Sequence, residues 1–154
     1  MNIRLAQSLD VKFILPLFKE LDAKHYRNSV DVKNNINDER YLVLFDNFFK
    51  ENSNLIITVA EDNEEIIAFA LSKITVVKNN FVFRDSLIGE ILYLAVDKNY
   101  KRMGVATQIM SDMEDRLKSK GVDRLETRVF SFNDETFPEK INYKPKYTVY
   151  EKYI

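Results

Sequence analysis

Apolar residues recur at intervals of three and four in two long stretches of this chain, residues 10–26 and 105–120. This spacing gives an α-helix one apolar face. The apolar positions are Phe13, Ile14, Leu17, Phe18 and Leu21 in the first stretch, and Ala106, Ile109, Met110, Met113 and Leu117 in the second. Both stretches are therefore predicted to be amphipathic helices that pack against a core.

The ends of these helices carry recognisable signals. Ser8 or Asp10 is a suitable N-cap for the first helix, whose Pro16 would either start the regular part of the helix or kink it. Gly121 is placed to end the second helix in a left-handed conformation. Residues 32–50, which are rich in aromatic side chains, also suit a helix.

Strand patterns occupy much of the rest of the chain. Residues 2–6 and 124–130 alternate between apolar and polar side chains, and residues 54–77 form two β-prone runs around the polar turn "EDNE". Residues 87–96, "LIGEILYLAV", are almost all apolar, which favours a central strand covered on both faces. Residues 131–140 are expected to be a loop or a short helix, and residues 146–154, "KYTVYEKYI", a final strand.

The order of these segments predicts the architecture. A strand, a helix and a strand follow one another between residues 87 and 130, so a right-handed crossover with parallel pairing is expected. The preceding hairpin adds antiparallel pairs. No repeat or flexible linker interrupts residues 1–154, so we predict a single α+β domain with a mixed sheet.

Composition excludes several classes of site. The formal net charge of −1 gives no reason to expect nucleic acid or an acidic membrane surface as a partner. The chain has no cysteine and only one histidine, His25, so disulfides, cysteine nucleophiles and a structural metal site are not expected. It also lacks a signal peptide or a membrane-spanning run, so we expect a cytoplasmic protein.

One of only three glycines, Gly104, stands in "YKRMGVATQIM", between a predicted strand and a predicted helix. A glycine at this place lets the backbone approach a ligand, and the unpaired amides of a helix N-terminus bind phosphate. Lys101 and Arg102 add positive charge, and Thr107 adds a hydroxyl group. The alternative is that these residues serve only turn geometry and solubility. Neither G-x-G-x-x-G nor G-x-x-x-x-G-K-[ST] occurs in the chain, which argues against dinucleotide oxidoreductases and P-loop enzymes.

The string "LAVDKNYKRMGVATQIM" resembles the acyl-CoA-binding signature of the GNAT acetyltransferases, R/Q-x-x-G-x-G/A after a buried strand. Lys101 stands at the R/Q place, Gly104 at the first glycine and Ala106 at the second. The order of elements from "NIRLAQSLDVKFILPLFKEL" to "SFNDETFPEKINY" is also similar. The resemblance implies a mostly antiparallel central sheet, with helices on both faces and a splayed pair of parallel strands that binds acyl-CoA.

The resemblance also implies the donor site. The pyrophosphate of acetyl-CoA would lie on the backbone amides of the loop, and the pantetheine arm would run beside the end of the preceding strand like an added strand. Asn133 matches an asparagine that often contacts this arm. The cofactor-binding residues implied are Leu94, Ala95, Val96, Lys101, Arg102, Met103, Gly104, Val105, Ala106, Thr107 and Asn133. No metal is expected.

Transfer of an acetyl group to an amine needs a base, because an amine with a pKa of about 10 is almost wholly protonated at neutral pH. Glu90 interrupts an apolar strand and resembles the base of the histone acetyltransferase branch of the family. The alternative is an exposed glutamate at the start of the strand. Without cysteine, direct attack in a ternary complex is the simplest route, with backbone amides near residues 94–96 polarising the thioester.

The chain departs from the family after Asn133, where "NDETFPEKINY" has Pro138 in place of the tyrosine that usually acts as the general acid. Tyr143 is the nearest replacement. This departure leaves a non-catalytic acyl-CoA-binding module as the alternative to an enzyme, and a structural protein without cofactor as a third hypothesis.

The acceptor is expected to be an amine on a small molecule, such as a polyamine or an amino-sugar, or on a protein. His25 lies after the first helix, on the side from which acceptors often enter, although a lone histidine is more often a surface or capping residue. Residues 146–154 could pair with a second copy in a homodimer.

Overall fold

The computed structural model of this protein describes residues 1–29, 31–32, 38–133 and 136–152. Five strands form one sheet in the order β1-β2-β3-β4-β5. The strands are β1 (Asn2–Leu5), β2 (Leu55–Asp62), β3 (Glu65–Val77), β4 (Ser86–Val96) and β5 (Arg124–Thr127). Neighbouring strands are antiparallel except β4 and β5, which are parallel. The predicted α+β fold with a mixed, mostly antiparallel sheet is confirmed.

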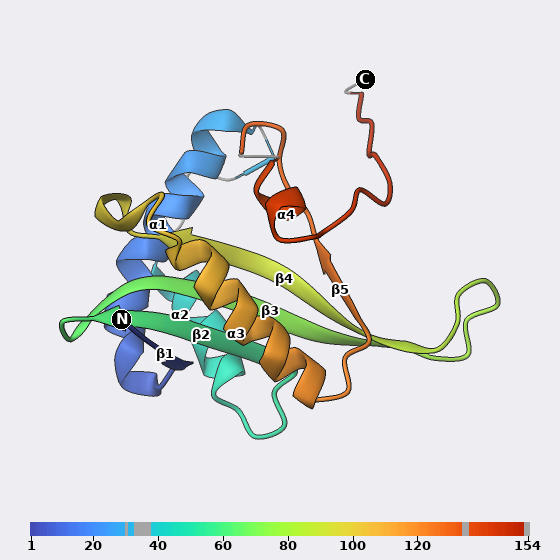
Figure 1. Cartoon of the computed structure of the whole chain (residues 1–154), viewed down its shortest axis with the longest axis horizontal. Coiled ribbons are helices and arrows are strands. Elements are labelled where there is room, and N and C mark those ends of the chain that lie inside the picture. Colours follow the sequence, from blue (N-terminus) through green and yellow to red (C-terminus); the bar gives the residue numbers. More distant parts are fainter. Residues whose placement is uncertain (30, 33–37, 134–135, 153–154) are drawn as a thin grey trace.

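Helices cover both faces of this sheet (Figure 1). The helices are α1 (Val11–Asn28), α2 (Asp38–Phe48), α3 (Val105–Ser119) and α4 (Thr136–Lys140), with short 3₁₀ turns η1 (Ser8–Asp10) and η2 (Lys98–Tyr100). Residues 33–37 of the segment expected to be helical lie outside the described residues.

The sheet separates two apolar clusters, one beneath α1 and α2 and the other beneath α3. In the first, Phe18 of α1 stacks on Phe69 of β3 at 5.2 Å between ring centroids and meets Tyr41 of α2 edge-on at 5.1 Å. In the second, α3 buries Val105, Ile109, Met110, Met113 and Leu117 against β2, β3 and β4. The apolar stripe predicted for residues 105–120 is this buried face.

The ends of α1 differ in detail from the signals read in the sequence. Asp10 precedes the helix, but its carboxylate accepts hydrogen bonds from the Gln7 amide (2.7 Å) and from Arg4 (2.6 Å) rather than capping α1. Arg4 holds the pKa of Asp10 below its usual value. Pro16 lies inside α1 on its exposed side, where water can satisfy the carbonyl group that proline leaves without a partner.

The final strand expected at residues 146–154 is absent among the described residues, because positions 144–152 carry no regular structure. Tyr147, Val149 and Tyr150 in this segment are exposed. A strand needs a pairing partner as well as β-propensity, and positions 144–152 pair with no strand of the sheet. The strand expected at 124–130 is also shorter and ends at Thr127.

Gly89 of β4 leaves room for side chains of α3 and β5 to pack against the strand. A Cβ atom at this position would lie 2.8 Å from Leu125 Cδ2 and 3.0 Å from Leu117 Cδ1. Glycine is therefore required here for space rather than for its backbone freedom.

We expect Gly89→Ala to lower the free energy of unfolding by about 1–3 kcal/mol, because the added methyl group overpacks the contact between α3 and β5. Urea unfolding followed by far-ultraviolet circular dichroism measures this change. A variant as stable as the wild type would show that the two leucine side chains move aside freely.

Candidate active site

The parallel pairing of β4 and β5 is short and defines an opening at the end of the sheet. It joins only four residue pairs, from Ile88 and Arg124 to Ile91 and Thr127. The Thr127 hydroxyl donates to the Ile91 carbonyl (3.4 Å) at the last pair. Beyond it β4 runs on to Val96 while the chain after β5 turns away, so the two strands diverge (Figure 1).

A bulge in β4 lies at the point of divergence. Ile91 pairs with Ser72 of β3 and Tyr93 pairs with Leu71, so Leu92 between them has no partner on β3. A bulge of this kind re-aims the backbone and side chains of the strand. Within the described residues, positions 92–96 of β4 pair only with β3, which leaves their other edge without a strand.

The three residues predicted to lie beside a pantetheine arm belong to this open edge. Leu94 and Val96 pack toward the α3 cluster, whereas Ala95 packs toward the α1 and α2 cluster. Their side chains are thus engaged on the two faces of the sheet. The backbone edge between them remains for a ligand that binds in the manner of a strand.

The loop before α3 has the backbone form that the sequence indicated. Gly104 is the N-cap residue of α3 with φ of +80°, and Arg102 also has a positive φ of +63°. The Gln108 amide donates to the Gly104 carbonyl at 3.1 Å, so the amides between them precede the first hydrogen bond of the helix. A Cβ atom at Gly104 would meet only Gln108 Nε2, at 3.7 Å, so the space above this turn is open.

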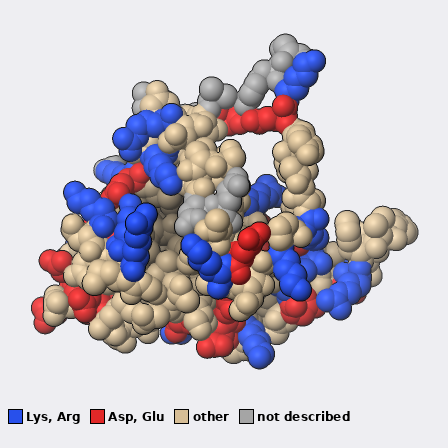
Figure 2. Space-filling model, turned by 45° about the horizontal axis from the view of Figure 1, so that its top comes forward, with Lys and Arg blue, Asp and Glu red and all other residues tan. Residues whose placement is uncertain are grey.

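The other loop residues predicted to bind the cofactor divide into anchors and exposed groups. Val105 is buried in the α3 cluster and Ala106 is half-buried, which fixes the first turn of the helix against the sheet. Lys101, Arg102, Met103 and Thr107 are exposed. The ammonium group of Lys101 lies 3.8 Å from the Glu20 carboxylate of α1, which ties the loop to that helix. Figure 2 shows Lys and Arg side chains at the left of the face that it draws, with Asp and Glu side chains among them.

Glu90 lies one residue before the end of the parallel pairing. It is paired in register with Lys73 of β3 and with Glu126 of β5. Because Gly89 faces α3, alternation along the strand turns Glu90 toward the opposite face, which α1 and α2 cover. Its carboxylate is half-buried and accepts a hydrogen bond from the Thr75 hydroxyl (2.9 Å). The alternative of a freely exposed glutamate does not describe this environment.

Sequence reasoning missed three residues of this region: Thr75, which donates to Glu90, Glu126, which pairs with Glu90 in register, and Lys146, which contacts Glu126. Glu126 approaches Arg124 Nε at 3.1 Å, and its Oε1 accepts a hydrogen bond from Lys146 Nζ at 2.7 Å. The period of two within 124–130 identified the face on which Glu126 lies, but not its register against β4. Nothing in the sequence pattern indicates that Lys146, from the C-terminal segment, reaches this place.

Asn133 and His25 both lie near the C-terminal end of α1, and His25 belongs to this helix rather than following it as expected. The Asn133 side-chain carbonyl accepts a hydrogen bond from Lys24 Nζ (2.6 Å). The His25 ring packs against Phe130 at 5.1 Å and Phe132 at 5.7 Å between centroids, and burial lowers the pKa of the histidine. This aromatic packing connects α1 to the loop after β5.

Tyr143 packs against the α3 cluster after α4. Burial raises the pKa of its phenol, and the nearby negative charge of Glu114 raises it further. The turn before it is closed by Asn142 with φ of +67°, a left-handed position that asparagine tolerates.

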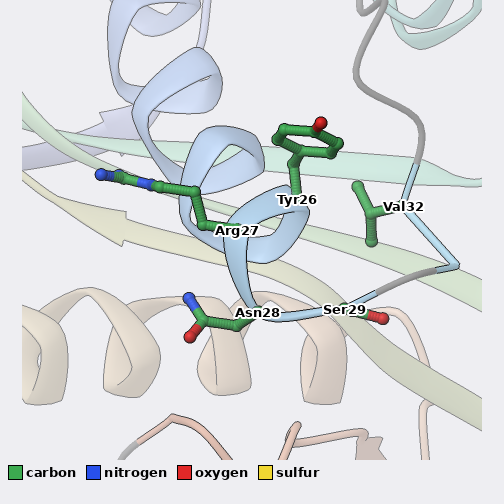
Figure 3. A pocket seen from close by; sticks show the side chains of 5 residues that line it. All are labelled: Tyr26, Arg27, Asn28, Ser29 and Val32. Atoms are coloured by element: carbon green, nitrogen blue, oxygen red, sulfur yellow. The ribbon is translucent and has the colours of Figure 1, made fainter.

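A pocket of about 510 Å³ lies at the end of α1 and is lined by Tyr26, Arg27, Asn28, Ser29 and Val32. Figure 3 shows Tyr26 and Val32 beside this space, while Arg27 points away from them. It contains none of the site residues predicted from the sequence. Within the described part of the chain, no group of acidic or histidine side chains suits a metal ion, and no helix is long and apolar enough to cross a bilayer.

The family model for the Acetyltransferase (GNAT) family matches residues 17–137, which is most of the chain. The chain belongs to the GNAT family. The match covers α1 from Leu17 onward, the divergent strand pair and the loop before α3. No curated protein matches the sequence.

Solved structures share this GNAT fold. A mutant protein from Bacillus halodurans has a TM-score of 0.86 at 19% identity, covering 100% of this chain and 99% of that one. The aminoglycoside N-acetyltransferase AAC(6')-Iy in complex with CoA has a TM-score of 0.80 at 16% identity, covering 99% and 93%. An acetyltransferase from Vibrio fischeri has a TM-score of 0.63 at 27% identity, covering 82% and 94%.

Proposed function

We propose that residues 1–154 form a single acetyltransferase domain that transfers an acetyl group from acetyl-CoA to a primary amine by direct attack in a ternary complex. The observation that carries this proposal is the open edge of β4 beside the Gly104 turn, in a chain of the GNAT family. A phosphate site and a strand-like binding edge at adjacent places match the pyrophosphate and the adjoining pantetheine arm of an acyl-CoA molecule.

The loop before α3 fits the pyrophosphate of the donor. Amides from Arg102 to Thr107 stand at or before a helix N-terminus, where the helix dipole favours an anion. The open space above Gly104 admits a phosphate group close to the backbone. Lys101 and Arg102 are exposed and add positive charge at the same end. This donor set needs no metal.

The remaining contacts with the donor would come from β4 and from the loop after β5. A pantetheine arm lying along residues 94–96 would supply amide and carbonyl groups to the edge that β5 leaves open, and Asn133 would contact it from the loop after β5. The Lys24 hydrogen bond to Asn133 would hold that side chain in place. Acetyl-CoA supplies an activated acyl group with a thiolate as leaving group.

The residues near the divergence provide the acid–base chemistry. An acceptor ammonium must lose a proton before it attacks, and we assign this proton to the Glu90 carboxylate or to a water bound to it. The hydrogen bond from Thr75 fixes the orientation of that carboxylate. Backbone amides near the bulge at Leu92 and along residues 94–96 would stabilise negative charge on the acyl oxygen.

The acceptor would approach from the face that carries Glu90, opposite α3. The structural neighbours include a complex of AAC(6')-Iy with an analogue that joins CoA to an acetylneamine and a glucosamine-6-phosphate N-acetyltransferase from Arabidopsis thaliana. An amino-sugar, a polyamine or a protein amine each remains within our proposal.

The proposal is tested by the release of free thiol from acetyl-CoA in the presence of a panel of polyamines, amino-sugars and N-terminal peptides. An amine-dependent rate supports an enzyme and names its acceptor. Binding of CoA without turnover on any amine would instead favour the acyl-CoA-binding module, and no binding would refute both.

We expect Gly104→Val to abolish CoA binding in a protein that still folds, because the side chain would occupy the phosphate space and oppose the left-handed backbone. Isothermal titration calorimetry measures the affinity. Gly121→Val is the matched control, since Gly121 ends the same helix with φ of +82° and lies away from the proposed site. If Gly104→Val binds CoA as tightly as Gly121→Val does, this placement of the cofactor is refuted.

We expect Glu90→Gln to lower kcat by about 10²–10⁴ with CoA affinity unchanged, because the amide keeps the shape of the side chain but accepts no proton. A higher pH should restore part of the rate by supplying more neutral amine. Glu126→Gln, the in-register neighbour on β5, is the control. A loss below about fivefold in the Glu90 variant would assign the base to another group.

We expect Tyr143→Phe to lower kcat by less than about tenfold, because a thiol with a pKa of about 8.5 leaves readily without a dedicated acid. Phenylalanine also preserves the packing of the ring against the α3 cluster. Steady-state kinetics across pH tests this expectation. A loss above about 100-fold, together with disappearance of the alkaline limb of the pH profile, would identify Tyr143 as the acid.

A further inference from the structure

Lys146 lies far from β5 in the sequence but in contact with it in the structure. Its Nζ donates a hydrogen bond to Glu126 Oε1 at 2.7 Å, and its side chain is about half exposed (50%). Lys146 belongs to the C-terminal segment at 144–152, which carries no regular secondary structure.

The partner of Lys146 places this amine beside the proposed catalytic centre. Glu126 pairs in register with Glu90, and adjacent strands lie about 4.8 Å apart. In a parallel pair the two in-register side chains project from the same face of the sheet. The next pair, Ile91 and Thr127, is the last before the strands diverge. The Glu126 contact therefore places Lys146 one residue pair before the point where β4 and β5 diverge.

We propose that Lys146 is a site of self-acetylation, at which this chain transfers an acetyl group to its own ε-amine. The inference rests on the proposed acetyltransferase function. The Nζ atom, after losing a proton to Glu90 or its water, bonds to the acetyl carbon as the carbon–sulfur bond of acetyl-CoA breaks. The electron pair of that bond leaves with sulfur, and the thiolate takes up a proton, so the products are acetyl-lysine and CoA.

The local energetics allow Lys146 to move from Glu126 to the donor. A half-exposed ion pair adds little to stability, so its release costs little. The irregular backbone of the segment can shift without breaking a helix or a strand. Lys73, the in-register neighbour of Glu90 on β3, lacks this freedom because its backbone is paired on both sides, with β2 and with β4.

Lys144 provides an internal control. It lies two residues before Lys146, is exposed, and makes no hydrogen bond or ion pair within the described part of the chain. Proximity to the site alone would give Lys144 and Lys146 nearly equal rates of acetylation. The Glu126 contact distinguishes them.

The test incubates the full-length protein with acetyl-CoA and no added amine, and follows each lysine by peptide mass spectrometry. We expect Lys146 to be acetylated about tenfold or more faster than Lys144, as expected for a positioned intramolecular amine. The rate constant should not change with protein concentration. Glu90→Gln should abolish the difference in acetylation rate between Lys146 and Lys144. Lys146→Arg should remove acetylation at this position while keeping acetyl transfer to an external amine.

A second measurement is independent of catalysis. Without acetyl-CoA, an amine-reactive acetyl ester should label Lys146 about two- to fivefold more slowly than Lys144, because the Glu126 contact shields it. Glu126→Gln should remove this difference. Equal labelling in the wild type would overturn the placement of Lys146.

The outcomes separate this inference from the proposed function. Amine-dependent thiol release with no acetyl group on Lys146, or with the acetyl group on Lys73, would overturn self-acetylation and leave the enzyme assignment intact. Equal modification of Lys144 and Lys146 would indicate unassisted chemical acetylation and also overturn it. Absence of both CoA binding and thiol release would overturn the function and the inference together.

Discussion

The limited pairing of β4 with β5 is the constraint on which the rest of this structure depends. Four in-register pairs are enough to hold the two strands together, and the pairing ends where β4 is bulged. A longer parallel ladder would satisfy the edge of β4 and leave no place for a strand-like ligand. A shorter one would not fix Glu90 beside Glu126. The end of the pairing, the open edge of β4 and the two acidic side chains therefore lie within a few residues of one another.

The three glycines of the chain all belong to the unit formed by β4, α3 and β5. Gly89 makes room for Leu117 and Leu125, so α3 can lie close to the parallel pair. Gly104 and Gly121 have positive φ at the beginning and the end of α3. Between them they fix the position and length of the helix, while its buried stripe anchors it to the sheet. The N-terminal amides are thereby presented beside the open strand edge.

The two faces of the sheet separate two kinds of chemistry. The α3 side carries the helix N-terminus and exposed cations of the loop, which suit an anion. The opposite face carries Glu90 and the hydroxyl of Thr75 near the end of the pairing, together with Glu126, whose carboxylate is contacted by Arg124 and Lys146. The gap between β4 and β5 connects these two faces. This separation explains how a donor and an acceptor could meet without competing for the same surface.

The sequence by itself determined the local elements and the turn before α3. Helical spacing identified α1 and α3, alternation and turn residues identified the β2–β3 hairpin, and Gly104 with its neighbouring cations identified the turn before α3. These features depend on residues close together in the chain. The tertiary structure alone decided that the C-terminal segment stays outside the sheet, that β5 stops at Thr127, that Glu126 pairs in register with Glu90, and that Lys146 contacts Glu126. Register and edge pairing depend on contacts between distant segments, and a period of two in a strand fixes the face of a side chain but not its neighbour.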